Sequence, residues 1–138
     1  MRKKIEVYIF KKTMRGYEFL MLKRNKEHDG IWQPVTGKAE KGEKILETAK
    51  REVKEETGLK DFVRIIDLEY SFKFKNKHGE FEEYAFGFEV SPQVEEISIS
   101  YEHQNYSWVN SETANELLFW DSNKEILKLI NNRLNRKT

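Results

Sequence analysis

The 138-residue sequence contains no cysteine and only two prolines. The absence of cysteine excludes disulfide bonds, thiolate catalysis and cysteine-ligated zinc. No apolar run approaches the roughly 20 residues that a membrane-spanning helix needs. The charged start MRKKIEVYIFKK also lacks the apolar core of a signal peptide. Neither charge sign prevails, because 25 Lys and Arg face 24 Asp and Glu. This balance does not favour a general binder of nucleic acid or membranes, and we expect a cytoplasmic protein.

The sequence has enough apolar and aromatic content for a folded core. Its hydrophobic share is 38% and its aromatic share 13%, and the apolar residues recur with regular periods that disordered chains lack. We therefore expect one domain over residues 1–138. Alternation predicts two hairpins and one further strand, at 5–12 with 17–24, at 62–75 with 81–90, and at 106–109. Helices are predicted at 43–57, at 111–118 capped by Ser111, and from a cap at Asp121 or Ser122 onward. This order predicts an α/β (α+β) fold with a mixed sheet between helices.

The predicted helix 43–57 carries acidic residues where an amphipathic helix needs apolar ones. At about 100° per residue, Ala49 and Val53 mark an apolar stripe, with Glu52 and Glu56 within or beside it and Glu55 one step around. Half-buried carboxylates this close repel one another and lose hydration. A divalent cation would compensate both effects. The alternative is a solvated helix whose charges pair four residues apart.

The stretch 37–59 resembles the Nudix box, G-x5-E-x7-R-E-U-x-E-E-x-G-U, in which U is an aliphatic residue. The fixed positions are all filled, by Gly37, Glu43, Arg51, Glu52, Val53, Glu55, Glu56, Gly58 and Leu59. The resemblance implies an α/β/α sandwich that hydrolyses a nucleoside diphosphate linked to another group. It also implies Mg²⁺ as the cofactor, with Mn²⁺ as the alternative.

The resemblance assigns roles to the acidic helix. Glu52 and Glu56 would be the chief metal ligands, and Glu55 would be a further ligand or the general base. Arg51 would orient these glutamates, because its planar guanidinium stays charged and can bond two carboxylate oxygens at once.

Further site candidates lie outside the helix. Gly37 has no side chain to keep its backbone from a metal, and Lys38 could meet a phosphate or be a solvated lysine. Family members often add an acidic residue from a later loop, and Glu102 is our candidate for both metal binding and catalysis. His103 could assist proton transfer, with a structural role as the alternative.

The approach to the box indicates a substrate class. The run from Trp32 to Gly37 resembles W-Q-x-V-T-G in the Nudix pyrophosphohydrolases of dihydroneopterin triphosphate and dATP. The resemblance implies cleavage of a nucleoside or pterin triphosphate to the monophosphate and pyrophosphate. Trp32, Phe72 and Tyr84 are candidates to stack on the ring of such a substrate, although aromatics at alternating strand positions also pack in cores.

Three other functions stay open. Diadenosine tetraphosphate hydrolases usually carry Pro-Gln-Gly where this chain has Val-Thr-Gly. A nucleotide-sensing module without activity would normally lack a box glutamate. RNA-end processing would use the basic chain ends, but solvated, frayed termini explain these residues better and the net charge is only +1, so nucleic acid is not an expected partner. These end residues are Arg2, Lys3, Lys4, Arg133, Arg136 and Lys137. The oligomeric state is left open between monomer and homodimer.

Overall fold

The computed structural model describes residues 1–136, apart from the side chain of His28. Lys137, one of the basic end residues, and Thr138 therefore lie outside the described residues. Within residues 1–136, seven strands form one sheet, accompanied by three α-helices and a short 3-10 helix, Lys26–His28. The strands are β1 Arg2–Thr13, β2 Gly16–Arg24, β3 Trp32–Gln33, β4 Val35–Lys38, β5 Arg64–Asn76, β6 Gly79–Glu89 and β7 His103–Asn110. The helices are α1 Ile45–Thr57, α2 Ser111–Leu117 and α3 Asp121–Leu134.

Strand β1 is the centre of the sheet. It runs parallel to β6 and antiparallel to both β2 and β4. Strand β6 pairs along one edge of β1. The other edge is shared by β2 and β4. There β4 pairs near the start of β1, with Gly37 opposite Ile5, and β2 pairs near its end. Strand β2 also pairs with β3 and β7. The start of the Nudix box is thus held at a sheet edge.

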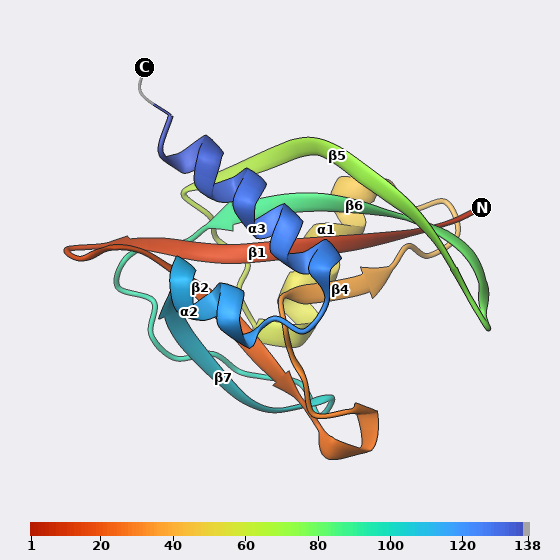
Figure 1. Cartoon of the computed structure of the whole chain (residues 1–138), viewed down its shortest axis with the longest axis horizontal. Coiled ribbons are helices and arrows are strands. Elements are labelled where there is room, and N and C mark those ends of the chain that lie inside the picture. Colours follow the sequence, from red (N-terminus) through yellow and green to blue (C-terminus); the bar gives the residue numbers. More distant parts are fainter. Residues whose placement is uncertain (137–138) are drawn as a thin grey trace.

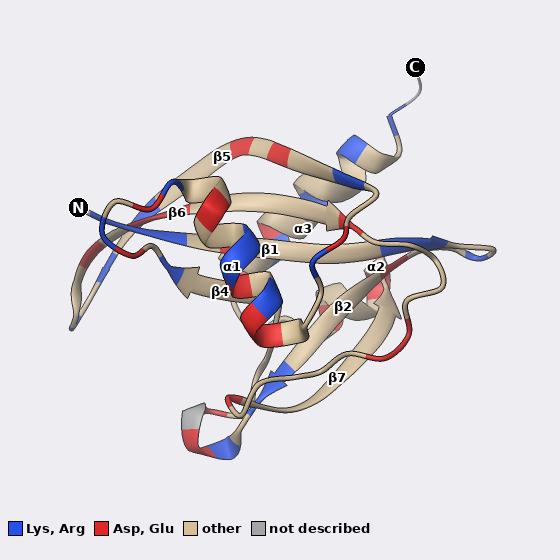
Figure 2. Cartoon of the chain, turned by 180° about the vertical axis from the view of Figure 1, so that it is seen from behind, with Lys and Arg blue, Asp and Glu red and all other residues tan. Residues whose placement is uncertain are grey.

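Both faces of the sheet are covered, which confirms the predicted α/β/α sandwich. On β1, Ile5 and Val7 face a core that contains Ala49 and Val53 of α1. The alternate residue Tyr8 faces a second core, which Ile126 and other residues of α3 complete. Figure 1 shows α3 crossing one face of the sheet, and the reverse view in Figure 2 shows α1 across the other.

Helix α1 begins later than predicted. It starts at Ile45, not Glu43, and Glu47 Oε1 accepts a hydrogen bond of 3.0 Å from the backbone N–H of Lys44. Glu43 lies just before the helix, where its carboxylate is engaged by other groups. At the other end, Gly58 has φ +79° and its N–H donates to the Lys54 carbonyl, so this glycine of the box ends the helix in a left-handed cap.

Two predicted caps are wrong. Asn110, not Ser111, caps α2, because its side-chain oxygen accepts from the N–H of Thr113. Helix α3 is preceded by Trp120 in extended geometry, so Asp121 already belongs to the helix. The predicted strand at 106–109 is also longer, and begins at His103. This extension brings His103 into the sheet beside Arg24 of β2. Among the described residues no helix is both long and apolar enough to span a membrane.

Candidate metal and catalytic site

Glu56 is the most deeply enclosed carboxylate of α1. It is only 4% exposed, and among the described residues its Oε2 has no hydrogen-bond partner. Burial raises its pKa to about 10, helped by a hydrogen bond with Glu52 and by the charges of Glu52, Glu102 and Glu55. A carboxylate in this position is stable as an anion only if a cation joins it. The predicted conflict between burial and charge on α1 is therefore present, and it centres on Glu56.

Glu52 packs against the backbone of β4. A Cβ atom added to Gly37 would lie 2.2 Å from Cδ of Glu52 and 2.6 Å from its Oε2. No larger residue therefore fits at position 37 while Glu52 keeps its place. The missing side chain brings the β4 backbone and the Glu52 carboxylate together at the edge of the sheet.

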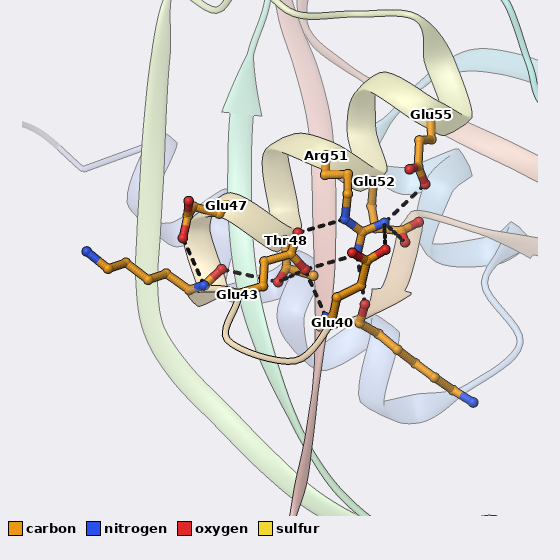
Figure 3. Close-up of polar contacts among 9 residues, drawn as sticks. Glu40, Glu43, Glu47, Thr48, Arg51, Glu52 and Glu55 are labelled. Atoms are coloured by element: carbon orange, nitrogen blue, oxygen red, sulfur yellow. Dashed lines mark hydrogen bonds and ion pairs between the residues drawn. The ribbon is translucent and has the colours of Figure 1, made fainter.

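Arg51 is the centre of a hydrogen-bond network within the box (Figure 3). Its Nε and Nη2 donate to the two oxygens of Glu43, at 2.7 and 3.1 Å. Its Nη1 donates to Glu52 Oε1 at 2.8 Å and to Glu55 Oε2 at 3.1 Å, while Nη2 also reaches the Lys38 carbonyl at 2.9 Å. One guanidinium thus links the loop before α1, two glutamates of α1 and the end of β4.

The electrostatics of this network follow from its geometry. Hydrogen bonding to Arg51 is the main reason that the pKa of Glu43 falls to about 2. The same pairing, led by Glu43, raises the pKa of Arg51 further above its usual range. Glu43, Glu52 and Glu55 share Arg51 as a positive partner, so this network has more negative than positive charge. The hydrogen bonds of Arg51 within the described residues do not include Glu56, whose pKa is raised by the charges of Glu52, Glu102 and Glu55.

The loop before β7 and the start of β7 contribute Glu102 and His103 to the site. The backbone N–H of Asn25 donates to the Glu102 carbonyl at 3.1 Å, which anchors this loop to the loop after β2. His103 is buried, and its Nε2 lies 3.6 Å from Glu56 Oε1 and 3.5 Å from Nε2 of Gln33. Sequence reasoning did not select Gln33. Gln33 could have been selected as a site residue because it belongs to the Trp32–Gly37 run that resembles W-Q-x-V-T-G.

These residues suit a hard divalent cation. Among the described residues, no three His, Asp or Glu side chains already form a metal-holding group. Even so, the site offers a buried carboxylate oxygen of Glu56 without a hydrogen-bond partner, three further carboxylates that raise the pKa of Glu56, and a glycine against Glu52. Oxygen donors of this kind are what Mg²⁺ and Mn²⁺ take in proteins. Glu52, Glu56 and Glu102 are the side chains that would hold the ion, next to the Gly37 backbone. Glu55 is 56% exposed on its side chain and bonded to Arg51, so it lies at the rim.

The three aromatic candidates for substrate stacking do not lie together. Trp32 and Phe72 pack against the core on the α3 side of the sheet. Tyr84 lies on the opposite side, packed against the α1 core. There it lines a groove of about 470 Å³ with Ile45, Leu46, Ile65, Asp67 and Phe86. One flat ring therefore cannot contact all three, because the sheet separates Tyr84 from the other two.

The family assignment rests on the whole fold as well as the box. The NUDIX domain family model matches residues 2–130, and the chain belongs to the Nudix family. This membership makes the chain a Nudix hydrolase that acts on phosphoanhydride bonds.

Several known proteins and solved structures are similar to this chain. An asymmetrical bis(5′-nucleosyl)-tetraphosphatase of Rattus norvegicus is 34% identical over 119 residues, 80% of this chain and 76% of that protein. An octanoyltransferase of Myxococcus xanthus is 36% identical over 115 residues, but the match spans 31% of its length. A NUDIX hydrolase of Listeria monocytogenes superposes with a TM-score of 0.84 at 36% identity, covering 95% of this chain and 92% of that one. The dihydroneopterin triphosphate pyrophosphohydrolase of E. coli superposes with a TM-score of 0.79 at 28% identity, covering 94% and 95%.

Proposed function

We propose that residues 1–138 form a single Nudix domain that hydrolyses a nucleoside or pterin triphosphate to the monophosphate and pyrophosphate. The observation that carries this proposal is the buried Glu56 carboxylate, raised in pKa and flanked by Glu52 and Glu102. Similarity to the E. coli pyrophosphohydrolase, together with the Trp32–Gly37 run, supports the triphosphate class. The cofactor is Mg²⁺, or Mn²⁺ in its place.

The chemical problem is the attack of water on a phosphorus surrounded by negative oxygens. When bound, the divalent ion neutralises phosphate charge and makes a hydroxide-like nucleophile available near neutral pH. Glu52, Glu56 and Glu102 would hold the ion, and Arg51 keeps Glu52 in place through the hydrogen bond of 2.8 Å. Glu55, at the solvent-exposed rim, is placed to accept a proton from water.

Dinucleoside tetraphosphate hydrolysis is the second candidate. The rat tetraphosphatase is a relative at 34% identity over most of both chains, which favours it. The Val35-Thr36 pair, in place of the Pro-Gln usual in that group, favours the triphosphate class. Both candidate reactions would use the same glutamates. Their substrates differ in the length of the phosphate chain and in the second nucleoside that a dinucleoside tetraphosphate carries.

A substrate panel tests the proposal. Nucleoside triphosphates, dihydroneopterin triphosphate, diadenosine tetraphosphate, ADP-ribose and a 5′-triphosphorylated RNA are each assayed with Mg²⁺. We expect monophosphate and pyrophosphate from a triphosphate as the fastest reaction. A dinucleoside tetraphosphate cleaved faster would select the second candidate, and faster cleavage of the RNA would select end processing. Tight nucleotide binding without turnover of any compound would show a sensing module instead.

Variants on one helix separate chemistry from folding. Glu56→Gln keeps the shape of the side chain but loses its charge, and should abolish Mg²⁺-dependent turnover. Glu47→Gln is the matched control, because Glu47 lies on the same helix and its oxygen contacts only the start of α1. Undiminished activity in Glu56→Gln would contradict the site assignment.

A further inference from the structure

The hydrogen bonds of Asn25 connect the loop after β2 to the turn that carries Glu102. The side-chain Nδ2 of Asn25 donates to the Tyr101 carbonyl, and its backbone N–H donates to the Glu102 carbonyl at 3.1 Å. These two carbonyls are consecutive, and Tyr101 lies 76 residues further along the chain than Asn25. One residue therefore fixes two successive peptide groups beside a candidate metal ligand.

The connection begins where the pairing of β2 with β7 ends. The pairing is regular as far as Lys23 and Asn105, then shifts at an irregularity, and ends with Arg24 opposite His103. Asn25 is the next residue, so its two hydrogen bonds continue the connection where the strands separate. Figure 1 shows the loop after β2 beside the start of β7.

Asn25 is itself held by the loop in which it lies. Its carbonyl accepts a hydrogen bond of 3.1 Å from the Gly30 N–H, which closes the loop over residues 25–30. Asn25 also precedes the 3-10 helix, a position at which an asparagine side chain commonly caps the helix. Its side chain makes no capping hydrogen bond there. The side-chain amide is directed to the Tyr101 carbonyl instead.

Glu102 depends on its backbone for its position. Its side chain is exposed, and its hydrogen bonds within residues 1–136 all involve the main chain. The carbonyl accepts from Asn25, and the N–H donates to Ser100 Oγ at 3.4 Å. The Glu102 carboxylate is nevertheless close enough to Glu56 to raise the pKa of that buried group. A shift of the turn would therefore move this carboxylate relative to Glu56.

The earlier part of the same loop is anchored independently of Asn25. Lys11 Nζ donates to the Val94 carbonyl at 2.7 Å. The Ser98 N–H donates at 3.1 Å to the carbonyl of Thr57, the last residue of α1. Loss of the Asn25 side-chain contact should therefore release the turn at 100–103 without detaching the rest of the loop.

We propose that Asn25 is a positioning residue that holds Glu102 at the candidate metal site. This inference rests on the proposed function, because only there is Glu102 a metal ligand. Asn25 acts through the turn at 100–103 and contacts neither the ion nor the substrate. Groups behind a metal ligand affect metal affinity because they fix the orientation of that ligand.

Binding of Mn²⁺ to the metal-free protein, followed by the EPR signal of the free ion, tests the proposal without any substrate. Asn25→Asp keeps the size of the side chain but places an oxygen where Nδ2 donates. Asn105→Asp is the matched control, because it adds the same charge three positions from Glu102. It also keeps the side-chain oxygen that accepts from the Tyr106 N–H at 2.8 Å.

The two variants should differ in the direction of their effects. An added negative charge by itself attracts a cation. Asn105→Asp should therefore leave Mn²⁺ binding unchanged or strengthen it. Asn25→Asp should weaken binding about threefold, the order of effect expected from one lost hydrogen bond. Unchanged or tighter binding in Asn25→Asp would overturn the proposal, and so would equal weakening in both variants.

A double-mutant cycle tests whether Asn25 acts through Glu102. The weakening caused by Asn25→Asp should disappear in the Glu102→Gln background, because the carboxylate that Asn25 positions is already lost. The same weakening in both backgrounds would overturn the proposal. If the wild-type protein cleaves no phosphoanhydride, the proposed function fails, and this cycle on Mn²⁺ binding still decides whether Asn25 positions Glu102.

Amide hydrogen exchange in EDTA provides a measurement that needs no metal. The His103 N–H donates to the Ser100 carbonyl at 3.1 Å, so its exchange rate reports whether the turn is closed. Exchange at His103 should be faster in Asn25→Asp and unchanged in Asn105→Asp, while thermal unfolding shows that both variants are folded. An unchanged exchange rate in Asn25→Asp would overturn the proposal.

Discussion

The carboxylate of Glu52 occupies the space that a side chain at Gly37 would take. A Cβ at position 37 would come within 2.2 Å of Glu52 Cδ. The contact joins the Nudix helix to the edge strand of the sheet, and it needs both a glycine and a glutamate. This contact gives a steric reason for the glycine at the start of the box, fifteen residues before Glu52.

Gly37→Ala should displace Glu52 and reduce Mg²⁺-dependent activity at least tenfold. The methyl group and the carboxyl carbon cannot share one place, so the Glu52 side chain must leave its position against β4. Gly42→Ala is the control. Gly42 has φ +79°, but a Cβ at this position would have no atom within 4 Å, so this change should cost about 1 kcal/mol of stability through the backbone alone. Steady-state kinetics and thermal unfolding of both variants check the prediction. Similar activity losses in both would show that the close contact is unimportant.

Arg51→Lys should lower activity about tenfold and raise the Mg²⁺ concentration needed for half-maximal rate. A lysine ammonium cannot bond Glu43, Glu52 and the Lys38 carbonyl together as the guanidinium does. Arg64→Lys is the matched exchange, since Arg64 makes a surface pair with Glu89 at 2.6 Å, away from the box. Metal titrations of the rate compare the two. A normal metal requirement in Arg51→Lys would contradict the positioning role.

The metal-free protein should lose stability as pH rises from 4.5 towards 10. The ordinary pKa of a Glu carboxyl is 4.5, and that of Glu56 in the fold is about 10. Between these values the folded protein keeps a proton that the unfolded chain releases, so rising pH favours unfolding. Urea unfolding in EDTA across this range measures the slope. Glu56→Gln should have a flatter profile, and an identical slope in both proteins would contradict the raised pKa.

Mg²⁺ binding near pH 7.5 should release about one proton, because the ion needs Glu56 as a carboxylate. Calorimetric titrations in two buffers of different ionisation enthalpy count the released protons. The release should disappear in Glu56→Gln. Proton release that persists in this variant would assign the proton to another group.

Glu102→Gln should weaken Mg²⁺ binding severalfold and bring the pKa of Glu56 closer to its ordinary range. The charge of Glu102 is one of the causes that raise this pKa. Glu96→Gln removes the same charge from an exposed side chain of the loop before β7 that is not among the causes of the raised Glu56 pKa, and it should change neither property. Metal titrations of both variants are the measurement. Equal metal affinity in the two would remove Glu102 from the site.

The sequence by itself determined the family, the class of fold and the acidic helix. Nine fixed box positions, the alternation in β1 and the glycine at 58 are local patterns, and local backbone physics is enough to interpret them. The predicted starts of α1, α2 and α3 were displaced by one or two residues. Glu43 and Asn110 lie just before their helices, where Glu43 bonds Arg51 and Asn110 caps α2. Whether such a residue is helical or lies before the helix depends on partners such as Arg51, eight residues further along the chain.

Only the tertiary structure decided which residues share a face and a site. Strand pairing placed Trp32 and Phe72 on one side of the sheet and Tyr84 on the other, although all three look alike in sequence. It also brought His103 to Glu56 and gathered Arg2, Lys4 and Lys38 around Phe81. These contacts join positions far apart along the chain. Their geometry follows from strand register and helix packing, which no local pattern in the sequence specifies.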